Sequence, residues 1–167
     1  MMPGMKPITI FWFRRDLRFE DNHGLYQALQ SEHNVLPLFI FDTDILDKLP
    51  KDDHRVSYIH QQLEEMNNQL IKQGSSLCVK QGKVQEIFEE LLEKYDVVQV
   101  VVNEDYEPQA IKRDKEIIKM LSERDVSFES YKDQVIFHKD EVVKGDRTAY
   151  RVYTPYKNAW KKLLDPE

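Results

Sequence analysis

The sequence predicts an α/β fold, in which helices cover both faces of an open, five-stranded parallel sheet. Apolar, strand-like runs alternate regularly with helical patterns, which is typical of βαβ units. The run from Val97 to Val102 is almost continuously apolar, as expected for a strand that is covered on both faces. Gly74 and Gly82 punctuate the connections between elements. Right-handed crossovers then favour the strand order 3-2-1-4-5.

Five short segments rich in apolar residues are expected to be the strands. They are residues 8–13, 35–41, 76–80, 97–102 and 126–131. The first of them stops abruptly at Arg14, where charged residues begin. The third contains Cys78, the only cysteine, which we interpret as a small core residue. A single cysteine allows no disulfide within the chain.

Three segments between the strands show the three- and four-residue spacing of apolar side chains that amphipathic helices have. They are residues 53–72, 83–95 and 108–124. Pro108 suits the first turn of the last of these helices. Asp21 and Asn22 offer an N-cap for a further helix that begins near His23. Helices in these places can cover both faces of the sheet.

The regular alternation ends near residue 131, which predicts two parts. Residues 1–131 are expected to be the α/β core, and residues 132–167 an irregular, aromatic-rich segment with a helix that starts at Thr154 and Pro155. The large side chains of Tyr150, Tyr153, Tyr156 and Trp160 need a surface to pack against. We therefore expect the chain to continue into a further domain, or the monomer to associate weakly through this tail.

Charge and composition argue against several functions. The net charge of −6 disfavours DNA binding by this chain unaided, because phosphate contacts require a basic surface. No apolar run reaches membrane-spanning length and no signal peptide is recognisable, so we expect a cytoplasmic protein without membrane contact. The five histidines share no spacing and have no cysteine partner, which disfavours a metal site. No serine or cysteine lies in a nucleophile elbow, so we expect no catalytic residue here.

Polar residues follow three predicted strands at the edge of the sheet where such folds bind ligands. The first strand is followed by Arg14, Arg15, Asp16 and Arg18, the second by Asp42 and Asp44, and the fourth by Asn103, Glu104, Asp105, Tyr106 and Glu107. Phe39 and Phe41 add aromatic faces. This mixture suits a planar heteroaromatic ligand. It does not suit a bare phosphate, because no glycine-rich loop follows the first strand.

Each of these residue groups also has a purely structural interpretation. The arginines can pair with Asp16, Asp21 or Asp114. Asp105 and Glu107 can be favourable charges at a helix N-terminus. Arg113 and Asp114 lie within the predicted helix and are interpreted as structural, and Arg55 as a solvated charge. The residues themselves leave both interpretations open.

Five stretches in order resemble the N-terminal domain of the photolyase/cryptochrome family. They are WFRRDLRFEDNHGL (12–25), LPLFIFDTDIL (36–46), the span from RVSYIHQQL (55–63) to GKVQEIF (82–88), NEDYEPQAIKRD (103–114) and AYRVYTPYKNAW (149–160). The resemblance implies a Rossmann-like domain that holds a light-harvesting antenna pigment. It also implies a helical C-terminal domain that binds FAD and damaged DNA, where reduced FAD splits cyclobutane pyrimidine dimers. This chain would then be the light-harvesting domain of a deoxyribodipyrimidine photolyase, a carbon–carbon lyase, and not catalytic alone.

The resemblance further implies which residues bind the pigment. The positions that match the family's deazaflavin pocket are Phe39, Arg55, Asp105 and Glu107, with Arg14 and Arg15 from the first loop. The folate-binding type has an Asn-Glu pair where this chain has Gln109 and Ala110. This departure favours a deazaflavin, with methenyltetrahydrofolate and flavin nucleotides as alternatives.

Two other functions compete with this one. A cryptochrome, a blue-light photoreceptor that signals through protein contacts, shares the first domain with photolyases. A stand-alone nucleotide-binding domain of the stress-protein or electron-transfer-flavoprotein type has a similar sheet, but it predicts glycine-rich phosphate loops that this sequence lacks. The photolyase interpretation predicts the chain's own FAD domain as a partner, and damaged DNA through that domain.

Overall fold

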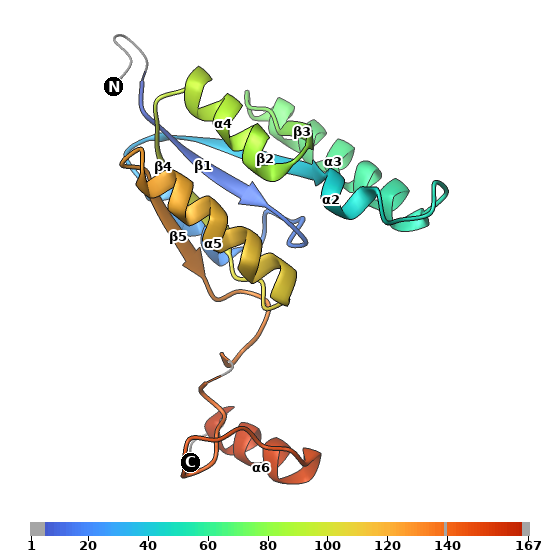
Figure 1. Cartoon of the computed structure of the whole chain (residues 1–167), viewed down its shortest axis with the longest axis vertical. Coiled ribbons are helices and arrows are strands. Elements are labelled where there is room, and N and C mark those ends of the chain that lie inside the picture. The colour runs from blue at the N-terminus through green and yellow to red at the C-terminus, as the bar shows by residue number, and fades with distance from the viewer. Residues whose placement is uncertain (1–5, 139, 165–167) are drawn as a thin grey trace. The chain divides into compact units, whose positions relative to one another are not determined.

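The structure is a computed structural model that describes residues 6–138 and 140–164. The chain divides into two compact units, Met1–Asp133 and Gln134–Glu167. In the first unit a parallel sheet has the order β3-β2-β1-β4-β5, as predicted (Figure 1). Its strands are β1 (Ile8–Phe13), β2 (Asn34–Asp42), β3 (Cys78–Gly82), β4 (Val97–Asn103) and β5 (Ser127–Tyr131). Winding therefore reverses between β1 and β4, which is where open sheets of this kind form their ligand crevice.

Five helices connect the strands of this unit. They are α1 (His23–Leu29), α2 (Thr43–Leu46), α3 (His54–Lys72), α4 (Val84–Lys94) and α5 (Pro108–Ser122). Asn22 caps α1 as predicted, since its Oδ1 accepts a hydrogen bond from the Leu25 amide at 3.0 Å. The sequence does not predict α2, because four residues are too few to show a helical period. Asp42 caps α2 and accepts from the Asp44 amide at 3.0 Å.

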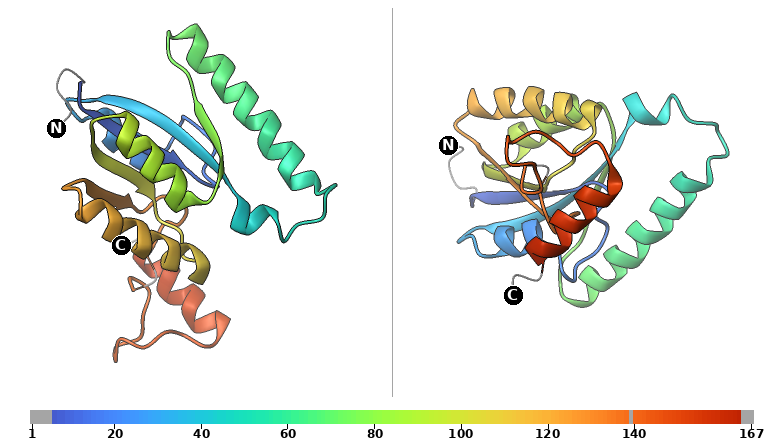
Figure 2. Two further views of the ribbon diagram at one scale, coloured as in Figure 1. Left: turned by 45° about the horizontal axis from the view of Figure 1, so that its top comes forward. Right: turned by 90° about the horizontal axis from the view of Figure 1, so that it is seen from below.

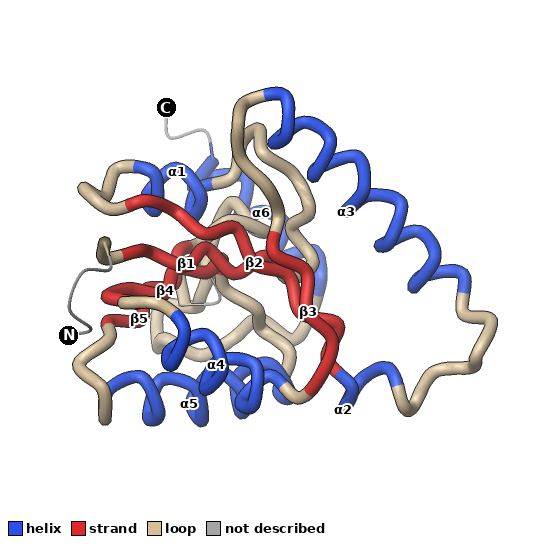
Figure 3. Tube along the Cα trace, turned by 90° about the horizontal axis from the view of Figure 1, so that it is seen from above, coloured by secondary structure: helices blue, strands red, loops and turns tan. Residues whose placement is uncertain are grey.

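The helices form a layer on each face of the sheet (Figure 3). On one face α4 and α5 pack over a core that includes Trp12 and Phe88, both nearly inaccessible to solvent. On the other face α1 and α3 pack over Phe11 and Phe13. The long α3 contributes only Leu63 and Met66 as buried residues, and it lies at the β3 side of the sheet (Figure 2). The strand ends that carry the polar residues are thus left uncovered between the two layers.

The second unit contains one helix, α6 (Tyr153–Leu164), within its described residues. The helix begins one residue before the predicted Thr154. Trp160 packs edge-on against Phe137, with ring centroids 5.5 Å apart, but Tyr153 is 73% exposed. Tyr153 thus leaves a large aromatic surface accessible to solvent. Within residues 6–138 and 140–164, no helix has the length and apolar character needed to cross a membrane.

Candidate functional site

A cavity of about 320 Å³ opens where β1, β2 and β4 end. Phe39 and Phe41 from β2 and Ile59 from α3 line its apolar part. Five of the six residues expected at the site contribute to its wall, namely Arg14, Arg15, Phe39, Arg55 and Asp105. The sixth, Glu107, lines a neighbouring cavity of about 570 Å³ that shares Arg15 and Asp105 with the first. The topology thus brings together residues that lie up to about ninety positions apart in the chain.

Arg14 is almost buried and points to structural partners. Its Nη1 donates to Oδ2 of Asp114 at 2.6 Å, and the side chain of Arg14 is only 6% exposed. Its Nη2 donates to the backbone carbonyl of Asn103 at the end of β4. These contacts tie β1, β4 and α5 together beneath the cavity. The geometry matches the structural interpretation in which Arg14 pairs with Asp114.

Arg15, in contrast, is half exposed at the mouth of the cavity. Its Nη2 lies 2.9 Å from Oε1 of Glu107, and its Nε lies 3.5 Å from Oδ2 of Asp105. The hydrogen bond to Glu107 raises the pKa of Arg15 above its ordinary value. Asp105 is only 8% exposed and also accepts from the Glu107 amide, at the N-terminus of α5. This cluster places hydrogen-bond donors and acceptors side by side at the mouth of the cavity.

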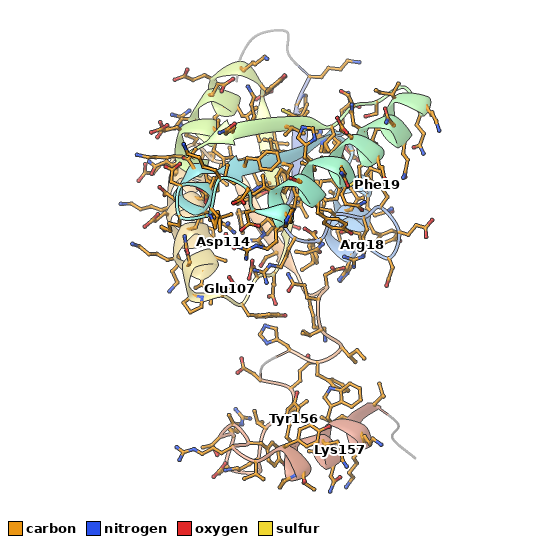
Figure 4. All side chains as sticks on the ribbon, turned by 90° about the vertical axis from the view of Figure 1, so that its right-hand side faces the viewer. Arg18, Phe19, Glu107, Asp114, Tyr156 and Lys157 are labelled. Atoms are coloured by element: carbon orange, nitrogen blue, oxygen red, sulfur yellow. The ribbon has the colours of Figure 1, made fainter. Side chains whose placement is uncertain are left out.

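The α5 side of the site carries further carboxylates. Glu107 is the N-cap of α5 and Asp114 lies in its second turn (Figure 4). Asp42 lines both cavities, and burial raises its pKa above the usual value. Asp42 is the last residue of β2, and its acceptor oxygens add to those of Asp105.

Arg55 lies at the cavity wall, but its guanidinium is engaged by a neighbour. The side chain is 73% exposed, and its Nη2 donates to Oδ2 of Asp53 at 2.6 Å. Asp53 is the N-cap of α3 and accepts from the Arg55 amide at 2.9 Å. Only the place of Arg55 in the wall supports the expectation that it belongs to the site. A ligand would have to compete with Asp53 for the N–H donors of the Arg55 guanidinium.

We expect acid to loosen the first turn of α3. The hydrogen bond from Arg55 lowers the pKa of Asp53 from 3.8 to about 2. A depressed pKa means that Asp53 stabilises the folded state above about pH 4, and that this contribution is lost as the pH falls through about 2. Titration of the Asp53 carboxyl by NMR measures its pKa, and amide exchange of residues 55–58 measures the stability of the first turn of α3. Asp53→Asn keeps the cap acceptor and should remove the pH dependence, whereas an Asp53 carboxyl that titrates near pH 4 contradicts the pairing.

A buried polar network holds the loop between β1 and α1. Nδ2 of Asn103 donates to Oδ2 of Asp16 at 2.6 Å and to Oδ1 of Asn22 at 2.8 Å, and Oδ1 of Asn103 accepts from the Gly24 amide at 2.8 Å. A Cβ on Gly24 would lie 2.6 Å from Oδ1 of Asn103, so only glycine fits there. Asp16, Asn22 and Asn103 are each 5% exposed or less. The network therefore fixes the backbone that carries Arg14 and Arg15.

Several wall residues were not singled out by the sequence analysis. They are Trp12 and the apolar side chains Ile45, Leu46, Leu49 and Val56, from α2, the following loop and α3. Arg113, which was interpreted as structural, also lies in the wall. Ile45, Leu46 and Leu49 come from a short helix and a loop, which have no periodic signal. Within the part of the chain that is described, no three histidine, cysteine or acidic side chains are grouped as a metal site would require.

Known proteins resemble this chain over almost all of its length. The family model described as DNA photolyase matches residues 9–167. A deoxyribodipyrimidine photo-lyase of Synechococcus sp. (strain ATCC 27144 / PCC 6301 / SAUG 1402/1) is 30% identical over 157 residues, which are 94% of this chain and 32% of that protein. Cryptochrome-2 of Arabidopsis thaliana is 30% identical over 160 residues, which are 94% of this chain and 25% of that protein.

Two solved structures extend the likeness to the fold. A bacterial class III photolyase from Agrobacterium tumefaciens superposes with a TM-score of 0.82 at 27% identity, and the match covers 94% of this chain and 32% of that one. An archaeal photolyase from Sulfolobus tokodaii, described with two FAD molecules and a novel light-harvesting cofactor, superposes with a TM-score of 0.77 at 35% identity. That match covers 90% of this chain and 34% of the other. The chain thus spans about a third of the length of these photolyases.

Proposed function

Because this chain belongs to the DNA photolyase family, we propose that it forms the N-terminal, light-harvesting domain of a deoxyribodipyrimidine photolyase. The observation that carries the proposal is the cavity at the strand ends, with aromatic, guanidinium and carboxylate groups in one wall. The chain matches the N-terminal region of the photolyases. A cavity in this place can hold a pigment without any catalytic residue.

The residues of the cavity fit a planar ring system. Phe39 and Phe41 offer faces for a ring, while Arg15 and Asp105 offer a donor and an acceptor for its polar edges. Arg14 contributes by holding the wall, and Arg55 and Glu107 contribute at the rim. A bound pigment supplies the absorption of light, whose energy is passed on to FAD. The protein residues position that pigment and shield it from water.

We propose a deazaflavin-type ring as the pigment, since Asp105 and Glu107 match the deazaflavin pocket and Gln109-Ala110 replaces the folate-contacting pair. A flavin nucleotide is the second candidate, which the two FAD molecules of the Sulfolobus photolyase favour. Both rings are planar and carry hydrogen-bonding edges, so the same wall groups can receive either. Methenyltetrahydrofolate is the third candidate.

Replacing Asp105 or Arg55 with alanine should weaken the binding of 5-deazariboflavin. Each change removes a charge-assisted hydrogen bond, which is worth about 1 kcal/mol or more, or roughly a fivefold rise in Kd. Absorption and fluorescence titrations with 5-deazariboflavin, FMN and methenyltetrahydrofolate measure the effect, and the unmodified chain should prefer the deazaflavin over the folate.

Glu123→Ala is the matched control, because Glu123 is an exposed acid at the other end of α5. It should leave every Kd unchanged. If the folate bound more tightly than the deazaflavin, and if the Asp105 and Arg55 variants bound like the unmodified chain, then this cavity would not be the pigment site.

On this proposal, the activity of the whole enzyme requires a further domain beyond the pigment-binding one. The remaining two thirds of the related photolyases would supply a helical domain that binds FAD and, through it, damaged DNA. We propose that residues 1–131 form the pigment-binding core and residues 132–167 lead toward that domain, with any self-association of the isolated chain occurring through the aromatic tail. We also propose that the protein is cytoplasmic, in line with its single cysteine.

A cryptochrome is the alternative that a specific observation supports, because Cryptochrome-2 of Arabidopsis thaliana matches the same region at 30% identity. Both functions use the same first domain, so the cavity does not separate them. Light-dependent repair of cyclobutane dimers by the protein joined to its FAD domain supports the photolyase, and bound FAD without repair supports the cryptochrome.

A further inference from the structure

Trp12 is a buried side chain in the cavity wall for which the proposed function gives no role. Its indole is 2% exposed and lines the cavity. Two guanidinium groups lie over the ring, because Cζ of Arg113 is 4.6 Å and Cζ of Arg14 is 5.4 Å from its centroid. Phe88 packs edge-on against it, with centroids 5.2 Å apart. Both distances lie within the roughly 6 Å over which a cation interacts with the face of an aromatic ring.

Asp114 holds both guanidinium groups in place over the indole. Its Oδ2 lies 2.6 Å from Nη1 of Arg14, and its Oδ1 lies 3.1 Å from Nη2 of Arg113. The three side chains together keep one net positive charge. All three are mostly buried, with 6%, 19% and 15% of their surface exposed, so water screens this charge from the indole only weakly.

An indole beside a light-absorbing ring presents a chemical problem. Indole is the side chain that gives up an electron most readily, and an excited flavin or deazaflavin is a strong one-electron oxidant. If Trp12 donated one electron to such a ring, the pair would recombine by returning that electron, and the excitation would be lost as heat. A nearby positive charge disfavours this step, because it destabilises the indole radical cation relative to the neutral indole.

We propose that Arg113, together with Arg14, keeps Trp12 from quenching a light-harvesting ring in this cavity by making the one-electron oxidation of the indole more difficult. The inference rests on the proposed function, since quenching matters only where excitation must be passed on. It gives Arg113 and Asp114, which the sequence analysis interpreted as structural, a role in the photophysics of the site.

The first test needs no pigment. In a Trp160→Phe background, Trp12 is the only indole of the chain. We expect Arg113→Gln to speed the oxidation of Trp12 by a flash-generated ruthenium(III) complex about threefold or more. Arg113→Lys keeps the charge and should restore most of the slower rate. Lys115→Gln removes an exposed charge from the same helix and should change nothing, and equal rates in the Arg113→Gln and Lys115→Gln variants overturn the proposal.

The second test measures the excited-state lifetime of bound FMN or 5-deazariboflavin, a quantity that does not depend on the fraction of sites filled. Arg113→Gln should shorten the lifetime by about twofold or more, and adding Trp12→Phe should restore it. An unchanged lifetime overturns the inference and leaves pigment binding intact. If neither of these rings nor methenyltetrahydrofolate binds the unmodified chain, the proposed function fails, and the oxidation rates alone decide the effect of Arg113 on Trp12.

Discussion

Asn103→Ala should lower the free energy of unfolding of the α/β unit by about 3 kcal/mol or more. The amide of Asn103 is 2% exposed and joins three groups from one loop, the Asp16 carboxylate, the Asn22 side chain and the Gly24 amide. Removing this amide leaves the Gly24 N–H, the Asn22 side-chain oxygen and the Asp16 carboxylate buried without this partner. For a chain of this length, that corresponds to a fall in Tm of about 10 °C.

Urea unfolding followed by Trp12 fluorescence in the Trp160→Phe background measures the loss within the first unit. Asn67→Ala is the matched control, because the Asn67 side chain accepts a single hydrogen bond, from the Leu77 amide at 2.9 Å. That change should lower the unfolding free energy by only about 1 kcal/mol. Equal losses in the two variants would show that the network contributes no more than one ordinary hydrogen bond.

The fold could be predicted from the sequence because its signals are local and repeated. The strand from Ile8 to Phe13 is apolar except for Thr9, and the observed β1 has the predicted bounds. Alternation of strands and helices, the right-handed crossover rule and the resemblance to the photolyase/cryptochrome family together favour the order that is observed in the sheet. The helix α2 could not be predicted, because its start depends on a single cap at Asp42 and its four residues give no period.

The site could be predicted only in part, because its details depend on partners that are distant in sequence. Strand topology predicts which loops meet, and five of the six expected residues do line one cavity. It does not predict that Asp114, a hundred positions after Arg14, turns that guanidinium inward. Trp12 could not be predicted as a wall residue for the same reason. Its position in an apolar strand indicates only that it is buried.

Two adjacent arginines show what the sequence alone cannot distinguish, and they allow a matched test. Arg14→Gln should lower the free energy of unfolding by about 2–4 kcal/mol, because Oδ2 of Asp114 and the Asn103 carbonyl lose the buried guanidinium that donates to them. Arg15→Gln should lower it by no more than about 1 kcal/mol, since its ion pairs lie at the solvent-exposed mouth of the cavity.

For ligand binding we expect the opposite. Under conditions where both variants are folded, Arg15→Gln should weaken binding more than Arg14→Gln does. In the proposed pigment site Arg15 lies beside Asp105 and Glu107, so Arg15→Gln should raise the Kd for 5-deazariboflavin about tenfold, the scale of one charge-assisted hydrogen bond. Urea unfolding and fluorescence titration on the two variants give both quantities. If Arg15→Gln caused the larger loss of stability, or if it left the Kd unchanged, the assignment of Arg14 to the scaffold and Arg15 to the ligand would be wrong. The opposed effects on stability and binding are expected because Asp114 reaches only the first of the two guanidinium groups.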